Sequence, residues 1–232
     1  MKIRQALLVL WLSAIGMAAY AGAEGTSQEE PISEANTVLF MSDHLADVRQ
    51  PMVLRYDFRK SGTLEEGFVD TVDVNVGAPK ANGGKDVRLR YFTGERARQF
   101  PPVQDAKGNP VLLLFLQRDV GEMQRLTEGN WRYFQRVIKL ALANAAQVKP
   151  VEFEFRGQPV QGTEIRITPY LNDAHAELNR FNAKYYVFTL SEAIPGHIYQ
   201  LRAVIPDKAA GGKSVLMEES ITFRGAEPLA RR

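Results

Sequence analysis

The sequence contains no cysteine and only 3 histidines among its 232 residues. The absence of cysteine excludes disulfides, thiolate metal sites, cysteine nucleophiles and a lipid-modified N-terminal cysteine, so the fold must be held by its core alone. With 45 % hydrophobic and 24 % charged residues, the chain is long enough to bury a sizeable core. Disordered, collagen-like and peptide-scaffold classes are therefore excluded.

The sequence also lacks the spacings that metal and nucleotide sites need. His44, His175 and His197 stand alone, with no pair close enough in sequence to bind one metal ion. Gly212-Lys213-Ser214 resembles the end of a phosphate-binding loop, but residue 207, where that loop needs glycine, is aspartate. No G-x-S-x-G serine motif occurs either. We therefore predict no catalytic residue, no metal site and no cofactor.

A hydrophobic leader is present at the start of the chain. Residues 1–23 combine a basic beginning, an apolar run over 6–19 and small residues at the end. This is the pattern of a cleavable secretory signal peptide, with cleavage expected after Ala21 or Ala23. We predict a periplasmic protein with no stable membrane span after leader removal, because no later apolar run approaches about 20 residues.

The mature chain is balanced in charge and has polar ends. The whole chain has 29 basic and 27 acidic side chains, and the leader carries two of the basic ones, so 27 of each sign remain. A neutral, exported chain disfavours nucleic acid as a partner. Composition predicts flexible tails at 24–35 and 226–232, on either side of a single antiparallel-sheet domain over 36–225.

Within this domain the dominant hydrophobic period is two. Segments 52–58 and 71–76 alternate apolar with polar residues, which predicts strands with one apolar face. Turn residues separate these segments, so 52–92 is predicted as an antiparallel meander. Further strands are expected at 151–156, 165–167, 184–190, 198–205 and 214–223.

One segment has a helical period instead. Trp131, Phe134 and Ile138 recur on one face, opposite charged residues, which predicts an amphipathic helical segment at 127–147. The earlier run Val111–Leu116 does not alternate and fits either a strand buried on both faces or the start of a helix. The predicted fold class is α+β: a mainly antiparallel sheet of about eight or nine strands with a helix packed on one face.

An arginine-rich stretch surrounds the end of the meander. Arg88, Arg90, Arg96 and Arg98 lie among aromatic residues, a combination that binds anionic head groups, polysaccharides or acidic protein surfaces by bidentate bonds and stacking. The plainer interpretation is a solvated strand face with ion pairs to neighbouring aspartates. We predict these four arginines as the polar or anionic contact.

The order of elements carries a resemblance to a known family. An export signal, consecutive antiparallel strands over 38–223 and a helix on the apolar face together resemble the half-barrel of the LolA-like periplasmic carriers of lipoproteins and lipids, without that family's long N-terminal helix. Segments 108–120 and 131–141 also resemble exported bacterial proteins of unassigned function. The LolA resemblance implies a helical lid over an acyl-chain site; the alternative is a helix that simply covers the sheet. The apolar lining implied in this way comprises Leu54, Tyr56, Phe58, Val72, Val74, Trp131, Phe134 and Ile138.

Two function classes follow from these observations. The leading hypothesis is a non-enzymatic periplasmic binding or carrier protein for a hydrophobic envelope component, a lipid or lipoprotein with its acyl chain. The alternative is an envelope assembly or protein-interaction module that uses a sheet edge or the arginine stretch to bind an envelope protein. Glu152 and Glu154, on one side of a predicted strand, leave a hydrolase as a third class. An apolar cavity under the sheet favours the carrier, whereas a packed interior favours the module.

Overall fold

The computed structural model describes residues 32–175, 178–209, 211 and 214–229. The predicted leader and most of the first predicted tail lie outside the described residues, as do Gly212 and Lys213 of the glycine-rich loop. The fold is that of the compact unit that begins at Ile32. No described helix is long and apolar enough to cross a membrane.

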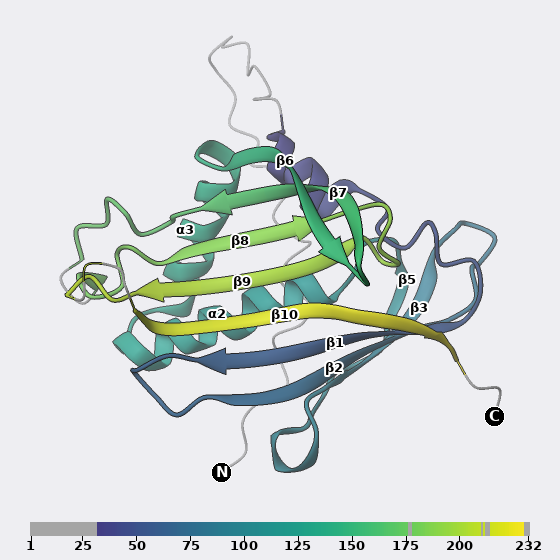
Figure 1. Cartoon of the computed structure of the whole chain (residues 1–232), viewed down its shortest axis with the longest axis horizontal. Helices are drawn as coiled ribbons and strands as arrows, with labels where there is room; N and C mark the ends of the chain where they lie inside the picture. Colours follow the sequence, from purple (N-terminus) through teal and green to yellow (C-terminus); the bar gives the residue numbers. More distant parts are fainter. Residues whose placement is uncertain (1–31, 176–177, 210, 212–213, 230–232) are drawn as a thin grey trace, which may run out of the picture. The chain divides into compact units, whose positions relative to one another are not determined.

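A single antiparallel sheet forms the largest part of the described structure (Figure 1). Its strands are β1 (Met52–Ser61), β2 (Phe68–Val76), β3 (Lys85–Tyr91), β4 (Arg98–Gln99), β5 (Val103–Ala106), β6 (Gln147–Phe155), β7 (Gln158–Ile167), β8 (Tyr185–Leu190), β9 (Ile198–Pro206) and β10 (Val215–Pro228). They are ordered β4-β3-β2-β1-β10-β9-β8-β7-β6, with β5 paired to β3. The sheet is open, with β4 and β6 at the ends of this order, and β10 joins its two halves by pairing with β1 and β9.

The predicted α+β class is confirmed. The described residues form ten strands instead of eight or nine, because the segment after β3 forms two short strands, β4 and β5, that both pair with β3. These strands contain 2 and 4 residues. Hydrophobic alternation cannot be recognised over so few positions, so the periodicity did not predict these two strands.

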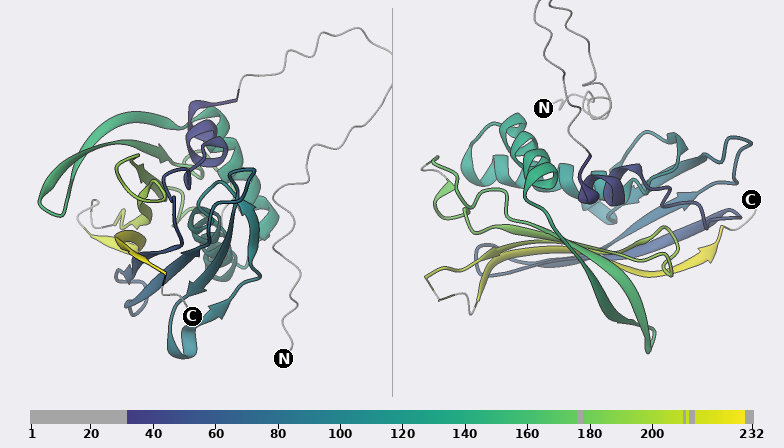
Figure 2. Two further views of the ribbon diagram at one scale, coloured as in Figure 1. Left: turned by 90° about the vertical axis from the view of Figure 1, so that its right-hand side faces the viewer. Right: turned by 90° about the horizontal axis from the view of Figure 1, so that it is seen from above.

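Two long helices cover one face of the sheet, the inner face (Figure 2). Helix α3 (Trp131–Asn144) is the predicted amphipathic helix, and the Asn130 side chain caps it by accepting the Arg132 N–H at 2.9 Å. Helix α2 (Val111–Thr127) contains the apolar run Val111–Leu116, which is therefore helical. Since α2 contacts both α3 and β9, it buries side chains on more than one side, and the run shows no clear period.

The predicted helical segment 127–147 is longer than the helix that forms there. Thr127 is the last residue of α2, and Glu128 ends that helix by adopting a left-handed backbone with φ 56°. Gln147 already belongs to β6. The period of the apolar residues identified α3, but it did not separate α3 from its neighbours.

Residues at the inner ends of both predicted tails belong to helices or strands. Helix α1 (Glu34–Asn36) continues into the π-helix η1 (Thr37–Met41), and Ala35 is buried, so the first tail does not reach residue 35. At the other end, β10 pairs with β1 as far as Pro228, so the second tail does not begin at 226. These described residues contact distant parts of the chain, which local composition does not show.

Candidate functional site

The predicted apolar lining on the first two strands lies in the packed core. Leu54, Tyr56 and Phe58 share the inner face of β1, and Val74 and Val72 are the register partners of Leu54 and Tyr56 on β2. All five side chains are at most 1 % exposed. The five side chains therefore share one face, and packed side chains fill the space in front of it.

Helix α2 covers these strands, rather than the predicted α3. The Arg118 guanidinium of α2 lies 5.1 Å from the centroid of the Phe58 ring and 5.3 Å from that of Phe92. Phe58 and Phe92 are themselves in edge-to-face contact at 4.6 Å. The inner face of β1 is thus occupied by a helix that sequence analysis did not resolve.

The α3 residues of the predicted lining lie in another part of the core. Phe134 and Ile138 are buried, whereas Trp131, in the first turn, is only partly buried. The Phe134 ring packs edge-to-face against Tyr170 at 6.1 Å, and α3 contacts β7 and α2. The expectation that this stripe faces β1 and β2 across one space is corrected, because α2 lies over that part of the sheet.

The predicted arginine contact divides into two pairs. Arg88 and Arg90 lie on the outer face of β3, where Arg90 donates a hydrogen bond to Asp73. Arg98 of β4 is the register partner of Tyr91, whose side chain is on the inner face, and Arg96 belongs to the short 3-10 helix η2 (Gly94–Arg96). Strand alternation and the turn at η2 separate the pairs, so the four arginines do not form one surface.

A cleft of about 830 Å³ opens beside the β7–β8 end of the sheet. It lies between η1 with its following loop on one side and β7 with the β8–β9 turn on the other. We call it the β7–β8 cleft. Its lining is mixed in polarity and comprises Val38, Ser42, Asp43, His44, Pro159, Val160, Gln161, Gly162, Thr163, Leu190, Ser191, Glu192, Ala193 and His197.

Two histidines that are far apart in sequence meet at this cleft. The rings of His44 and His197 lie 6.0 Å apart between centroids. His44 is buried, its Nε2 lies 2.7 Å from the Val38 carbonyl oxygen, and its Nδ1 accepts the Asn109 N–H at 3.2 Å. Burial lowers the pKa of His44, which favours the neutral ring. The two hydrogen bonds of this ring hold the loop that follows η1 in place. Sequence spacing could not reveal this pair, because the fold alone brings the two loops together.

These histidines do not form a metal centre. His197 Nε2 lies 3.1 Å from Asp47 Oδ2, and His175 pairs with Asp173 instead. Across the described part of the chain, no group of three or more His, Cys, Asp or Glu side chains is placed to hold a metal ion. Both nitrogens of His44 are already engaged with the backbone, so this ring is not available as a ligand.

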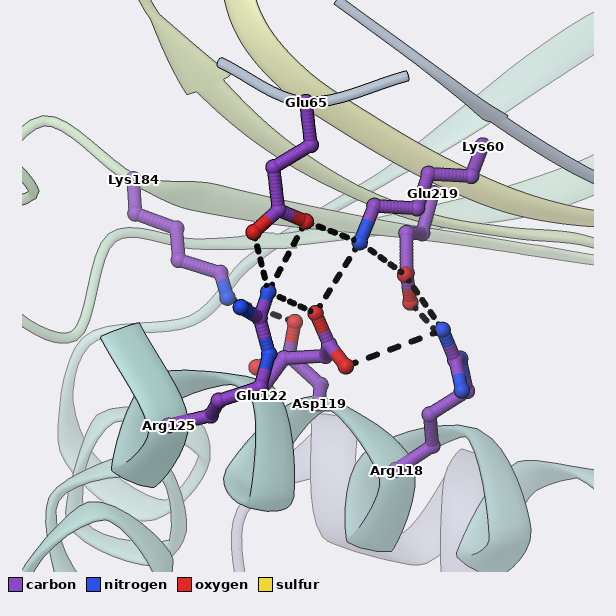
Figure 3. A network of polar contacts seen from close by, with 8 residues as sticks. All are labelled: Lys60, Glu65, Arg118, Asp119, Glu122, Arg125, Lys184 and Glu219. Carbon is purple, nitrogen blue, oxygen red and sulfur yellow. Dashed lines mark hydrogen bonds and ion pairs between the residues drawn. The ribbon is translucent and has the colours of Figure 1, made fainter. Parts of the chain in front are cut away.

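A second polar site, a cluster of ion pairs, lies between helix α2 and the sheet (Figure 3). Lys60 Nζ lies 2.8 Å from Glu65 and 3.0 Å from Glu122, and Arg118 makes a bidentate contact with Glu219 at 2.7 and 3.0 Å. Nearby, Lys184 contacts Asp119 separately. We call the larger group the charged cluster; its members are Lys60, Glu65, Arg118, Glu122, Arg125 and Glu219.

Mutual pairing favours the ionised form of the carboxylates in this cluster. The hydrogen bond from Lys60 lowers the pKa of Glu65. Burial alone would raise the pKa of Glu122, but hydrogen bonds from Arg125 and Lys60 bring it below its ordinary value. Burial raises the pKa of Glu219, and the bidentate ion pair with Arg118 opposes this change. The cluster therefore places fixed charge against the core.

Comparison with known proteins assigns no family to this chain. No protein-family model matches the chain, and no curated protein matches it. Among solved structures it is similar to a LolA superfamily protein, NE2245 from Nitrosomonas europaea, at 10 % identity and TM-score 0.23, over 85 % of this chain and 94 % of that one. A putative outer membrane lipoprotein-sorting protein domain from Vibrio parahaemolyticus gives 7 % identity, TM-score 0.24, and coverage of 78 % and 88 %.

A third solved structure, a DUF1329 family protein from Desulfovibrio piger, gives 8 % identity and TM-score 0.24 over 79 % of this chain and 87 % of that one. The first of the three carries the name of the family that the order of elements resembles. Superposition at these TM-scores is too loose to transfer any residue, ligand or role to this chain. The site is therefore argued from its own geometry.

Proposed function

We propose that this protein is a non-enzymatic binding or carrier protein for a hydrophobic envelope component, a lipid or lipoprotein, in the periplasm. The observation that carries the proposal is the β7–β8 cleft, whose volume of about 830 Å³ falls within the range of ligand pockets, about 300–1,000 Å³. The proposal places the acyl chain there, since the face of β1 and β2 is filled by packed side chains.

The lining of the cleft suits a ligand with an apolar body and a polar end. Val38, Val160 and Leu190 provide apolar surface from three separate elements. Ser191 and His197, both in the β8–β9 turn, add hydroxyl and imidazole groups at the same cleft. The Ser191 hydroxyl donates to the Gln161 carbonyl oxygen at 2.6 Å and accepts the Ala193 N–H at 3.2 Å, so one acceptor position remains for a ligand. An amphipathic molecule would bury its chain against the first set and keep its polar end hydrogen-bonded at the second.

A fluorescent fatty acid tests this placement. The purified protein is titrated with dansyl-labelled undecanoic acid, whose emission rises in an apolar site. Val160→Trp adds bulk inside the cleft and is expected to weaken probe binding about 10-fold or more. Val69→Trp is the matched control, because Val69 is 73 % exposed on β2 and does not line the cleft. Absence of probe binding, or equal weakening by both variants, would contradict the proposal.

A second candidate function is supported by the packed inner face. Because the five predicted lining residues on β1 and β2 are fully buried, that part of the interior favours an interaction module over a lid with a cavity. The edge strand β6 offers the free sheet edge that such a module needs. Native mass spectrometry of the protein taken from the exported fraction of its host separates the two: an acylated small molecule supports the carrier, and a stoichiometric protein complex without lipid supports the module.

A further inference from the structure

A pocket of about 320 Å³ opens beside the charged cluster. It lies near one end of the strand order, whereas the β7–β8 cleft lies near the other end. Helix α2, strand β3 and the η2–β4 segment contribute to its walls. We call it the arginine pocket. Its lining residues are Lys60, Glu65, Phe68, Tyr91, Phe92, Arg96, Arg98, Arg118, Glu122 and Arg125.

Positive charge exceeds negative charge in this pocket. Five cationic side chains line it against the two carboxylates of Glu65 and Glu122. Glu219 lies behind them and pairs with Arg118, so five cations face three carboxylates in total and two positive charges remain. Each of the three carboxylates is already shared among Lys60, Arg118 and Arg125.

Arg96 and Arg98 take no part in these ion pairs. The Arg96 guanidinium stacks over the Phe68 ring at 4.6 Å, and Arg98 Nη1 donates to the Ala97 carbonyl oxygen at 3.0 Å. Neither pairs with a carboxylate among the residues that the structure describes. Both side chains are exposed at the mouth of the pocket, where their remaining N–H groups are available to a ligand.

One of the lining residues has a buried hydroxyl without a partner. Tyr91 is 4 % exposed, and its hydroxyl makes no hydrogen bond. Buried polar atoms nearly always have a partner, and leaving one unpaired costs about 1–3 kcal/mol. Burial raises the pKa of Tyr91, so the hydroxyl keeps its proton and can donate it. An acceptor that reached this hydroxyl from the pocket would satisfy it.

We propose that the arginine pocket binds a phosphate group, with Arg96, Arg98 and Tyr91 as donors. Guanidinium groups bind phosphate oxygens in a bidentate way, and the two unbalanced positive charges match the charge of about −1.5 to −2 on a phosphate monoester. Phe68 and Phe92, in edge-to-face contact at 5.5 Å, provide an apolar wall for whatever carries the phosphate. This site is separate from the β7–β8 cleft, so the inference does not depend on the carrier proposal.

The phosphate can be free or part of a lipid head group, and calorimetry with two probes distinguishes these sources. The purified protein is titrated with sodium phosphate against a sodium chloride blank of equal ionic strength. It is then titrated with phosphatidic acid vesicles, with phosphatidylcholine vesicles as the blank. Arg96→Gln or Arg98→Gln is expected to raise the Kd for the bound probe about 10-fold. Arg88→Gln is the matched control, since it removes the same charge from the outer face of β3.

Tyr91→Phe separates a binding role from a structural one. Loss of the hydroxyl is expected to raise the Kd about 3- to 10-fold, because one hydrogen bond to a charged group is lost. In the free protein the same variant is expected to leave the unfolding midpoint unchanged or raised, because an unpaired buried hydroxyl is removed.

The outcomes of these titrations are distinct. Binding of either probe that weakens with Arg96→Gln and persists with Arg88→Gln supports the inference and identifies the source. Failure of both probes to bind would overturn it. Equal weakening by Arg88→Gln and Arg96→Gln would also overturn it, since that result indicates only a general attraction to positive charge.

Discussion

Removing the negative charge of Asp119 is expected to destabilise the protein strongly. The Asp119 carboxylate of α2 accepts hydrogen bonds from Lys184 Nζ at 2.5 Å and from the Tyr186 hydroxyl. Lys184 and Tyr186 are 0 % exposed and Asp119 is 1 % exposed. Asp119→Asn keeps the size of the side chain but leaves a buried ammonium group without a counter-charge. Such a loss costs about 3–5 kcal/mol, a large share of a typical unfolding free energy of about 5–15 kcal/mol.

Guanidinium unfolding, followed by tryptophan fluorescence, measures this cost. Glu164→Gln is the control, because it breaks the partly exposed Lys149–Glu164 ion pair, where about 1 kcal/mol or less is expected. Lys184→Met should cost about as much as Asp119→Asn, since it leaves the carboxylate buried without its cation. The double variant should cost less than the sum, with a coupling of about 2–3 kcal/mol. Additive costs, or an Asp119→Asn effect no larger than that of Glu164→Gln, would refute the reasoning.

Three further predictions, with five substitutions, concern the core and the cleft. Leu54→Trp and Val74→Trp each add bulk to a packed face and should cost roughly 1–3 kcal/mol in chemical denaturation; an unchanged midpoint would instead reveal a cavity. Phe134→Ala should cost about 3–5 kcal/mol and Trp131→Ala clearly less, because only Phe134 is fully buried; equal costs would show that the α3 interface is misplaced. His44 has a lowered pKa when folded, so the unfolded chain takes up its proton first and stability falls as pH drops below about 6.5, by at most about 1.4 kcal/mol per pH unit. His44→Asn should remove this slope when the free energy of unfolding is measured between pH 7.5 and 5.5. Parallel curves of unfolding free energy against pH for the wild type and the variant would contradict this prediction.

Alternation along the sequence predicted the strands whose two faces differ. On β3, Val87, Leu89 and Tyr91 are buried, while Arg88 and Arg90 are exposed, as a period of two requires. The same reasoning could not resolve α2. That helix contacts both the sheet and α3, so apolar residues occupy most of its circumference and the period that defines an amphipathic helix is lost.

The charged cluster could have been anticipated in part from the same pattern. Lys60 is in phase with Tyr56 and Phe58 on β1, and Glu219 is in phase with Ile221 on β10. A charged residue at an inward position of an alternating strand indicates a buried ion pair. The partners could not be identified in this way, because Arg118 and Glu122 lie on α2, whose position over β1 and β10 is a property of the tertiary fold.

The β7–β8 cleft and the arginine pocket should act as independent sites. Strands β3 and β7 are separated by six steps in the strand order, which corresponds to roughly 29 Å along the sheet at about 4.8 Å per step. Effects at sites more than about 7–10 Å apart usually add. Val160→Trp should therefore weaken the fatty-acid probe without changing phosphate binding, and Arg96→Gln should do the reverse.

The double variant Val160→Trp with Arg96→Gln completes this test. If the sites are independent, its two affinities equal those of the single variants, measured by probe fluorescence and by calorimetry. If one phospholipid occupied both sites, each substitution would weaken both probes, and the separate assignments of the cleft and the arginine pocket would have to be replaced by one continuous site. The packed inner face of β1 and β2 lies between them in the strand order, and for this reason we expect independence.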